Sequence, residues 1–136
     1  MSKGNTTEND VLKKIFQATE FSWDANVNLY VGLHTADPGE GGAQNTSECA
    51  YGSYARQTVA RDATGWDVAG NQASNDDLIQ FPQCSSGTET ITHVSIGTAA
   101  AGAGQILYSG ALSANLAVSS GIQPQFAANA LTVTED

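Results

Sequence analysis

The chain is organised around residues 28–61, NLYVGLHTADPGEGGAQNTSECAYGSYARQTVAR. Apolar residues stand at every second position from just before this stretch into its first part, and in a strand they would share one face: Val27, Leu29, Val31 and Leu33. This predicted strand spans residues 27–35 and ends at Asp37-Pro38-Gly39, because proline removes a backbone donor and glycine tolerates the positive φ of a turn. Residues 40–51 are predicted to form an exposed loop. Residues 54–61, YARQTVAR, alternate again, so the stretch predicts a strand, a long loop and a strand.

Further strand-like runs follow, separated by turn residues at intervals of about 8 to 12 residues. They cover residues 66–71, 78–82, 88–98, 105–112 and 122–134, the last with a break at about Ala128-Asn129. Run 88–98, TETITHVSIGT, is the richest in β-branched residues and is expected at the centre of a sheet. The pattern predicts an all-β fold of about seven or eight strands, either an antiparallel sandwich, jelly-roll-like, or a small barrel. We expect one β-sandwich domain over residues 1–136, with an N-terminal arm and helix in residues 1–20.

The N-terminal part carries the one predicted helix, at about residues 8–19. Its apolar side chains and one threonine lie on a single stripe: Val11, Leu12, Ile15, Phe16 and Thr19. Acidic Glu8 and Asp10 suit the positive end of the helix dipole. This short amphipathic helix would either cover one end of a sheet or reach onto a neighbouring subunit.

The charge excludes several classes of partner. The chain has 14 acidic and 5 basic residues, which gives a net charge of −9. Binding to nucleic acid needs clustered lysine and arginine, so neither nucleic acid nor an acidic substrate is expected as a partner. The polar start, MSKGNTTEND, does not resemble a signal peptide, and no apolar run has the length of about 18 residues that a membrane span requires. We therefore expect a protein made in the host cytoplasm, with no membrane partner.

No pattern in the sequence predicts a catalytic, cofactor or metal site. His34 and His93 both fall inside predicted strands, where a single histidine is typical of a hydrogen-bonded sheet residue. No pair such as HxxxH or CxxC would fix two zinc ligands, and no glycine pattern matches a nucleophile elbow or a P-loop. The sequence therefore predicts a protein that is not an enzyme and uses no cofactor.

Three residues are singled out for structural roles. Arg56 lies in a predicted strand of a chain with only two arginines, so we expect an ion pair with a carboxylate, within the chain or between subunits, rather than a ligand contact. Cys49 and Cys84 both fall in predicted loops. They are either two free thiols or a disulfide that forms late, once the protein has left the reducing cell.

Six short blocks of the chain resemble a family of small virion proteins of tailed bacteriophages, often labelled tail fibre proteins. The blocks are LYVGLHTADPGEGG at 29–42, EC at 48–49, YARQTV at 54–59, IQFP at 79–82, THVSIG at 92–97 and QILYSGAL at 105–112. The combination of LHTADP, YARQ and FP carries the resemblance over nearly the whole chain. It implies a structural protein of the virion with no activity, cofactor or catalytic residue, whereas Cys49 and Cys84 depart from the family pattern.

Three functions remain open on the sequence. A fibre shaft needs repeats or a coiled coil, which this chain lacks, so we favour a capsid cement or decoration protein that binds the major capsid protein and self-associates on the virion. A tail, collar or head-fibre component is the alternative, and a small hydrolase or lectin-like binder is the third. Contacts with virion partners are expected from residues 1–16 and from the loop at 37–51. The candidate contact residues are Lys3, Phe16, Asp37, Pro38, Glu40 and Tyr51.

Overall fold

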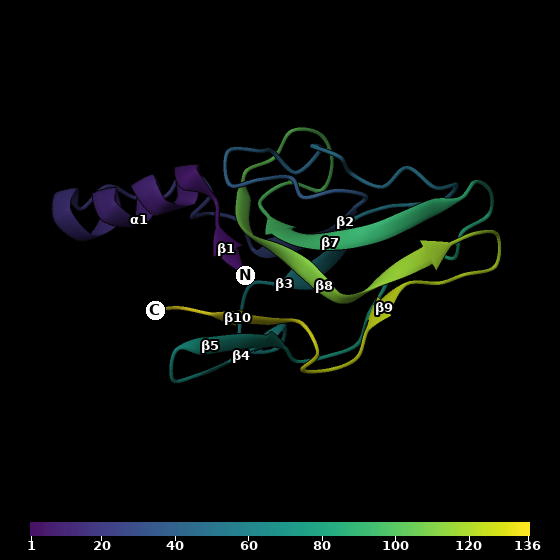
Figure 1. Cartoon of the computed structure of the whole chain (residues 1–136). Helices are drawn as coiled ribbons and strands as arrows, with labels where there is room; N and C mark the ends of the chain where they lie inside the picture. Colours follow the sequence, from purple (N-terminus) through teal and green to yellow (C-terminus); the bar gives the residue numbers. More distant parts are fainter.

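Three antiparallel sheets form the body of the protein in the computed structural model, which describes residues 1–136 (Figure 1). The largest sheet has the order β1-β8-β7-β2-β3. Its strands are β1 (Ser2–Lys3), β2 (Asn28–His34), β3 (Gln57–Ala60), β7 (Glu89–Gly97) and β8 (Ile106–Val118). The two smaller sheets contain β4 (Trp66–Ala69), β5 (Gln72–Asn75) and β10 (Thr132–Thr134), and β6 (Ile79–Gln80) with β9 (Gln125–Phe126). The sheets do not close into a barrel, which was the other possibility. The predicted all-β, sandwich-like fold is therefore confirmed.

The core lies between the five-stranded sheet and the two smaller ones, which Figure 1 shows beneath it. Val31 and Leu33 of β2 share the buried face that their spacing predicted. Strand β7 lies between β8 and β2, so its predicted central position is also confirmed. Phe81, just after β6, is fully buried and packs against the rings of Tyr54 and Phe126.

Several boundaries differ from those predicted. Residues 66–71 do not end in an isolated turn: the chain reverses at Gly70, where φ is 63°, and returns as β5 in a hairpin with β4. Strand β8 continues to Val118, and its pairing with β7 shifts register between Ile91 and His93, where β8 bends (Figure 1). The run 122–134 contains β9 and β10, and the break expected at about Ala128-Asn129 lies between them.

The helix α1 (Asn5–Gln17) extends away from the sheets instead of covering one of them (Figure 1). It begins and ends earlier than the predicted range 8–19. Gly4 precedes its first turn without a capping side chain, and Ala18, with φ of 54°, ends it in the left-handed region. Thr7 is its only buried residue. Neither α1 nor any other segment forms a helix long and apolar enough to cross a membrane.

Candidate interaction surfaces

The base of α1 is attached to β8 by side chains of its first two turns. The hydroxyl of buried Thr7 donates to the carbonyl oxygen of Ile106 at 2.9 Å. The amide Nε2 of Gln105 donates in turn to Thr7 Oγ1 and to Asp10 Oδ2, both at 3.0 Å. These contacts join α1 to the start of β8, so the direction of the helix is set by the sheet.

The backbone before α1 strengthens this attachment. Gly4 donates to the carbonyl of Leu107 at 3.1 Å, and Asn5 donates to the carbonyl of Glu40 at 2.9 Å. A Cβ atom on Gly4 would lie 2.5 Å from the carbonyl oxygen of Ile106, so the chain passes too close to β8 for a larger residue. The first turn of α1 is therefore fixed both to β8 and to the loop that follows β2.

Beyond its first turns, α1 carries an apolar surface that nothing in the chain covers. Leu12, Ile15 and Phe16 are 54%, 67% and 78% exposed, and their spacing places them on one face of the helix. We call these three residues the α1 stripe. Burial of such side chains contributes about 1.5–3 kcal/mol each, so their exposure on a projecting helix makes the α1 stripe a candidate contact surface.

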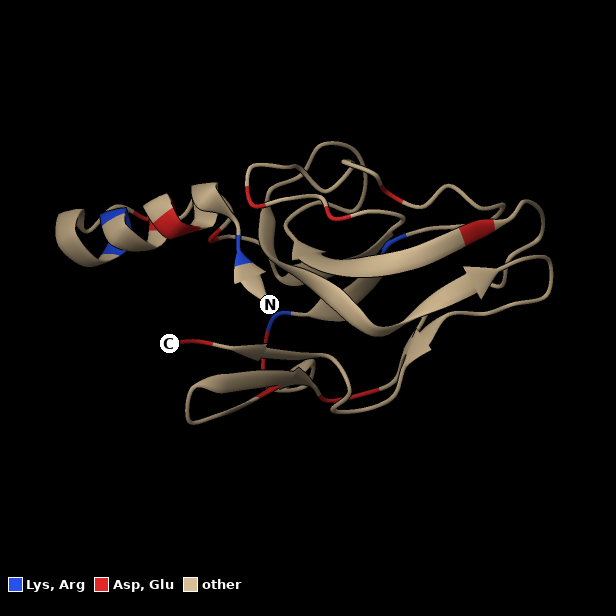
Figure 2. Ribbon diagram, viewed as in Figure 1, with Lys and Arg blue, Asp and Glu red and all other residues tan.

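The charges of the chain single out one lysine beside this stripe. Four of the five basic residues form ion pairs within the chain, namely Lys3–Glu135, Lys14–Glu20, Arg56–Glu48 and Arg61–Asp24. Lys13 alone has no acidic partner. Figure 2 shows basic and acidic residues together on α1, and acidic residues spread over the strands and loops of the sheets. The two lysines of α1, Lys13 and Lys14, are balanced by Glu8 and Asp10, so the helix as a whole is neutral in a strongly acidic protein.

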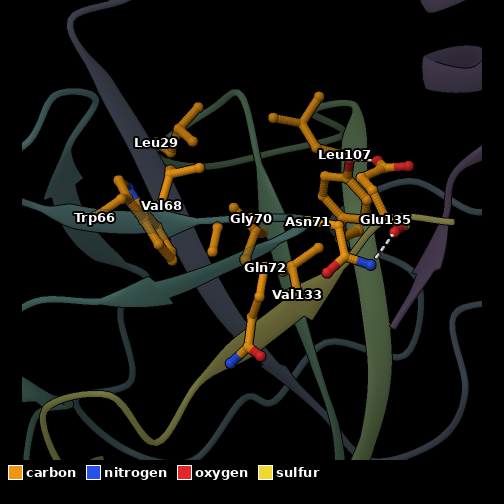
Figure 3. A pocket seen from close by; sticks show the side chains of 12 residues that line it. Leu29, Trp66, Val68, Gly70, Asn71, Gln72, Leu107, Val133 and Glu135 are labelled. Atoms are coloured by element: carbon orange, nitrogen blue, oxygen red, sulfur yellow. Dashed lines mark hydrogen bonds between the residues drawn. The ribbon is translucent and has the colours of Figure 1, made fainter.

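A second uncovered apolar surface lies between the five-stranded sheet and the β10-β5-β4 sheet. It is an open cavity of about 320 Å³, which we call the inter-sheet cavity (Figure 3). Its lining is Leu29, Trp66, Val68, Gly70, Asn71, Gln72, Ala73, Ile96, Leu107, Tyr108, Val133 and Glu135. Val68, on β4, is 71% exposed. The cavity is thus mainly apolar and accessible from outside.

Polar contacts hold the edge of this cavity in place. Asn71 Nδ2 donates to the backbone carbonyl of Glu135 at 2.7 Å, as the dashed line in Figure 3 marks. The carboxylate of Glu135 accepts from the hydroxyl of Tyr108 and from Lys3 Nζ, and these two donors lower the pKa of Glu135, Tyr108 having the larger effect. Burial in turn raises the pKa of Tyr108. The N- and C-terminal segments are therefore tied together beside the cavity (Figure 1).

The loop predicted to be exposed at 40–51 is only partly exposed, because Gln44, Cys49 and Tyr51 are buried against the body of the protein. Gln44 is fully buried, donates through its backbone to the carbonyl of Gly104 at 2.8 Å and accepts through Oε1 from the amide of Ala99 at 2.9 Å. The backbone amide of Cys49 donates to the carbonyl of Leu33 at 2.9 Å. The prediction was wrong for these buried residues because it treated the whole loop as solvated, whereas Gln44 and Cys49 form hydrogen bonds inside the fold.

This packing changes the set of candidate contact residues. Tyr51 is 3% exposed, with its hydroxyl donating to the carbonyl of Pro82, and Pro38 is buried as well. Neither can contact a partner from these positions. Asp37, Glu40 and Phe16 are exposed, and Lys3 is half-buried in its ion pair with Glu135. Asp37 and Glu40 line one hollow together with Met1 and Ser2, whereas Phe16 lies outside it on α1. Sequence reasoning missed the inter-sheet cavity, because its lining comes from six strands and their turns.

Arg56 lies just before β3 rather than inside a strand, and it forms the most buried ion pair of the chain. Its Nε and Nη2 donate to the two carboxylate oxygens of Glu48 at 2.6 and 2.8 Å. Nη1 and Nη2 also donate to the carbonyls of Ala99 and Gly102, in the turn between β7 and β8. The hydroxyl of Tyr54 donates to Glu48 at 3.0 Å. This cluster fixes two loops to each other.

Both cysteines and one of the two histidines are buried. Cys49 and Cys84 are both buried and free, and burial together with the carboxylate of Glu89 raises the pKa of Cys49 to about 12. His34 is fully buried between the carbonyl of Thr46 and the hydroxyl of Ser95. No group of three or more His, Cys, Asp or Glu side chains is arranged to hold a metal ion.

Comparison with known proteins supplies the family. No curated protein matches the chain. A family model described as podophage GP4 fiber I protein gp80 matches residues 2–134, from β1 to the end of β10. The match supports a structural protein of the phage virion, and it covers the α1 stripe and all of the inter-sheet cavity except Glu135. The chain therefore belongs to the podophage GP4 fiber I protein gp80 family and is a component of the virion.

Proposed function

We propose that the protein is a non-enzymatic fibre subunit of a podophage and that α1 connects it to another chain of the virion. The observation that carries this proposal is the α1 stripe: three large apolar side chains on a helix that extends from an otherwise compact β structure. A fibre subunit must bind other virion proteins, and a fixed, projecting helix offers an apolar face for that contact.

The family favours a fibre over the capsid cement protein that we preferred from the sequence. That preference rested on the absence of repeats, but a short β subunit with a projecting helix can form part of a fibre without a repetitive shaft. No finding supports the major capsid protein as the partner. The non-enzymatic role is supported by the fibre family and by the structural contacts of Arg56, His34 and Cys49.

The test is to count this protein in purified phage particles. A phage carrying Ile15→Ser and Phe16→Ser should incorporate at least about tenfold fewer copies, because the apolar contact is lost while the fold, checked by circular dichroism, is unchanged. Val27→Ser is the matched control, since Val27 is equally exposed, at 77%, but lies outside α1. Quantitative mass spectrometry gives the copy number of each protein relative to the major capsid protein.

Two results would contradict the proposal. Normal incorporation of the Ile15→Ser, Phe16→Ser variant would show that α1 does not connect the subunit to the virion. A wild-type copy number comparable to that of the major capsid protein would indicate a capsid cement protein rather than a fibre subunit.

A further inference from the structure

Two uncovered apolar surfaces of this chain are complementary to each other. Seven large hydrophobic residues are exposed, of which three form the α1 stripe and a fourth, Val68, lines the inter-sheet cavity. One surface is convex, a row of side chains on a helix, and the other is concave. A contact between them would cover four of the seven exposed residues at once.

The inter-sheet cavity has room for side chains of the α1 stripe. A cavity of about 150 Å³ holds one benzene ring, so the 320 Å³ here accommodates about two side chains such as those of Phe16 and Ile15. Figure 3 shows Leu29 and Val68 on one side and Leu107 on the other, with space between them. The lining therefore offers apolar contacts from both sheets to a side chain that enters.

Charge also favours this pairing. A neighbouring hollow shares Trp66 and Val68 with the inter-sheet cavity and is lined in addition by Asp62, Asp67 and Asp76. Its one basic residue, Arg61, already pairs with Asp24. Lys13, next to the α1 stripe, is the basic residue without an acidic partner. An occupant that brings the α1 stripe into the cavity would thus place a lysine near unpaired carboxylates.

The helix cannot fill the cavity of its own chain. Its first turns are attached to β8 through Thr7 and Gln105, and from there it leads away from the sheets (Figure 1). With 13 residues at 1.5 Å each, α1 is about 20 Å long, enough to reach a neighbouring subunit. The occupant that matches in shape and charge is therefore the same helix of another copy.

We infer that the α1 stripe of one subunit binds in the inter-sheet cavity of a second copy of the chain. This inference rests on the proposed function and names the partner of α1. The donor and acceptor surfaces are different parts of the molecule, so two copies can exchange helices reciprocally, or several can form a closed ring. In both arrangements each subunit gives one helix and receives one.

The test uses two variants of the purified full-length chain, each of which removes one half of the contact. Ile15→Asp with Phe16→Asp removes the donor surface, and Val68→Asp removes the acceptor surface. All three positions are exposed, so both variants should fold. By light scattering at micromolar concentration, the wild type should form oligomers, and each variant alone should dissociate with a Kd at least about tenfold higher. Val27→Asp is the control and should assemble like the wild type.

Mixing the two variants gives the decisive measurement. The Val68→Asp chain keeps an intact helix and the Ile15→Asp, Phe16→Asp chain keeps an intact cavity, so the mixture should form a 1:1 complex. A bundle of α1 helices predicts the opposite: Val68→Asp would assemble normally and mixing would change nothing. That result, or a wild type that stays monomeric, would overturn the inference.

The outcomes separate this inference from the proposed function. If the wild-type protein is monomeric but Ile15→Ser with Phe16→Ser still removes it from virions, α1 binds a different virion protein and only the inference fails. If the purified variants behave as expected but incorporation into virions is normal, the subunits associate through α1 and the proposed attachment of the fibre through α1 fails.

Discussion

The clearest stability prediction concerns the ion pair between Glu48 and Arg56. Replacing Glu48 by Gln keeps the shape of the side chain but removes its charge. The guanidinium of Arg56, with a side chain only 2% exposed, would then be buried without a carboxylate. Loss of one partner of a buried ion pair costs about 3–5 kcal/mol, and because Glu48 is 17% exposed we expect the lower end, about 3 kcal/mol.

The matched control is the pair between Asp24 and Arg61, whose side chains are 42% and 28% exposed. Asp24→Asn should lower the free energy of unfolding far less than Glu48→Gln does, because solvent screens an exposed pair. Urea denaturation of the wild type and of the two variants gives the change in the free energy of unfolding for each substitution, provided that the three m-values are equal. Equal small effects of Glu48→Gln and Asp24→Asn would refute the argument that burial makes the Arg56 pair important.

Two further predictions concern the buried histidine and the cysteines. Burial lowers the pKa of His34, whereas the unfolded chain titrates near 6.5, so the unfolded state binds more protons at acidic pH. The free energy of unfolding should therefore fall below about pH 6.5, by at most about 1.4 kcal/mol per pH unit, and His34→Asn should weaken this dependence in denaturation curves measured from pH 7.5 to 5.5. The thiols of Cys49 and Cys84 should not react with a thiol reagent at pH 8 in the native protein, because both are buried and the pKa of Cys49 is about 12. Both should react after unfolding without reductant, and finding no reactive thiol then would reveal a disulfide.

The sequence predicted those parts of the fold in which apolar residues alternate. Strand β2 was found because Leu29, Val31 and Leu33 repeat at a period of two, and β7 because its β-branched residues are typical of a central strand. Strand β5 was missed because its sequence, QASN, has no apolar repeat. Its Asn75 is fully buried, and its side-chain amide donates to the carbonyls of Asp77 and Ala127. No hydrophobic pattern reveals such a residue.

The candidate site was predicted only in part, for a related reason. The apolar period of α1 indicated the stripe with Phe16, and the sequence allowed the helix to reach a neighbouring subunit. The cavity could not be predicted, because Leu29, Val68 and Leu107 come from three strands whose pairing depends on the whole fold. Tyr51 was placed on the surface since it follows a polar loop, but its ring fills the space beside Tyr54.

The attachment of α1 to β8 also sets the order in which the protein can mature. Thr7 is separated by 99 residues from Ile106, to which its hydroxyl donates. At about 5–20 residues per second, a ribosome needs about 5–20 s to synthesise the intervening chain. During that time the helix lacks its anchor on β8 and has only the contact between Asn5 and Glu40, so its apolar face is not yet held in the direction it has in the finished subunit. A nascent chain therefore presents this face correctly only after nearly all of the sheet has been made, which delays assembly until the subunit is folded.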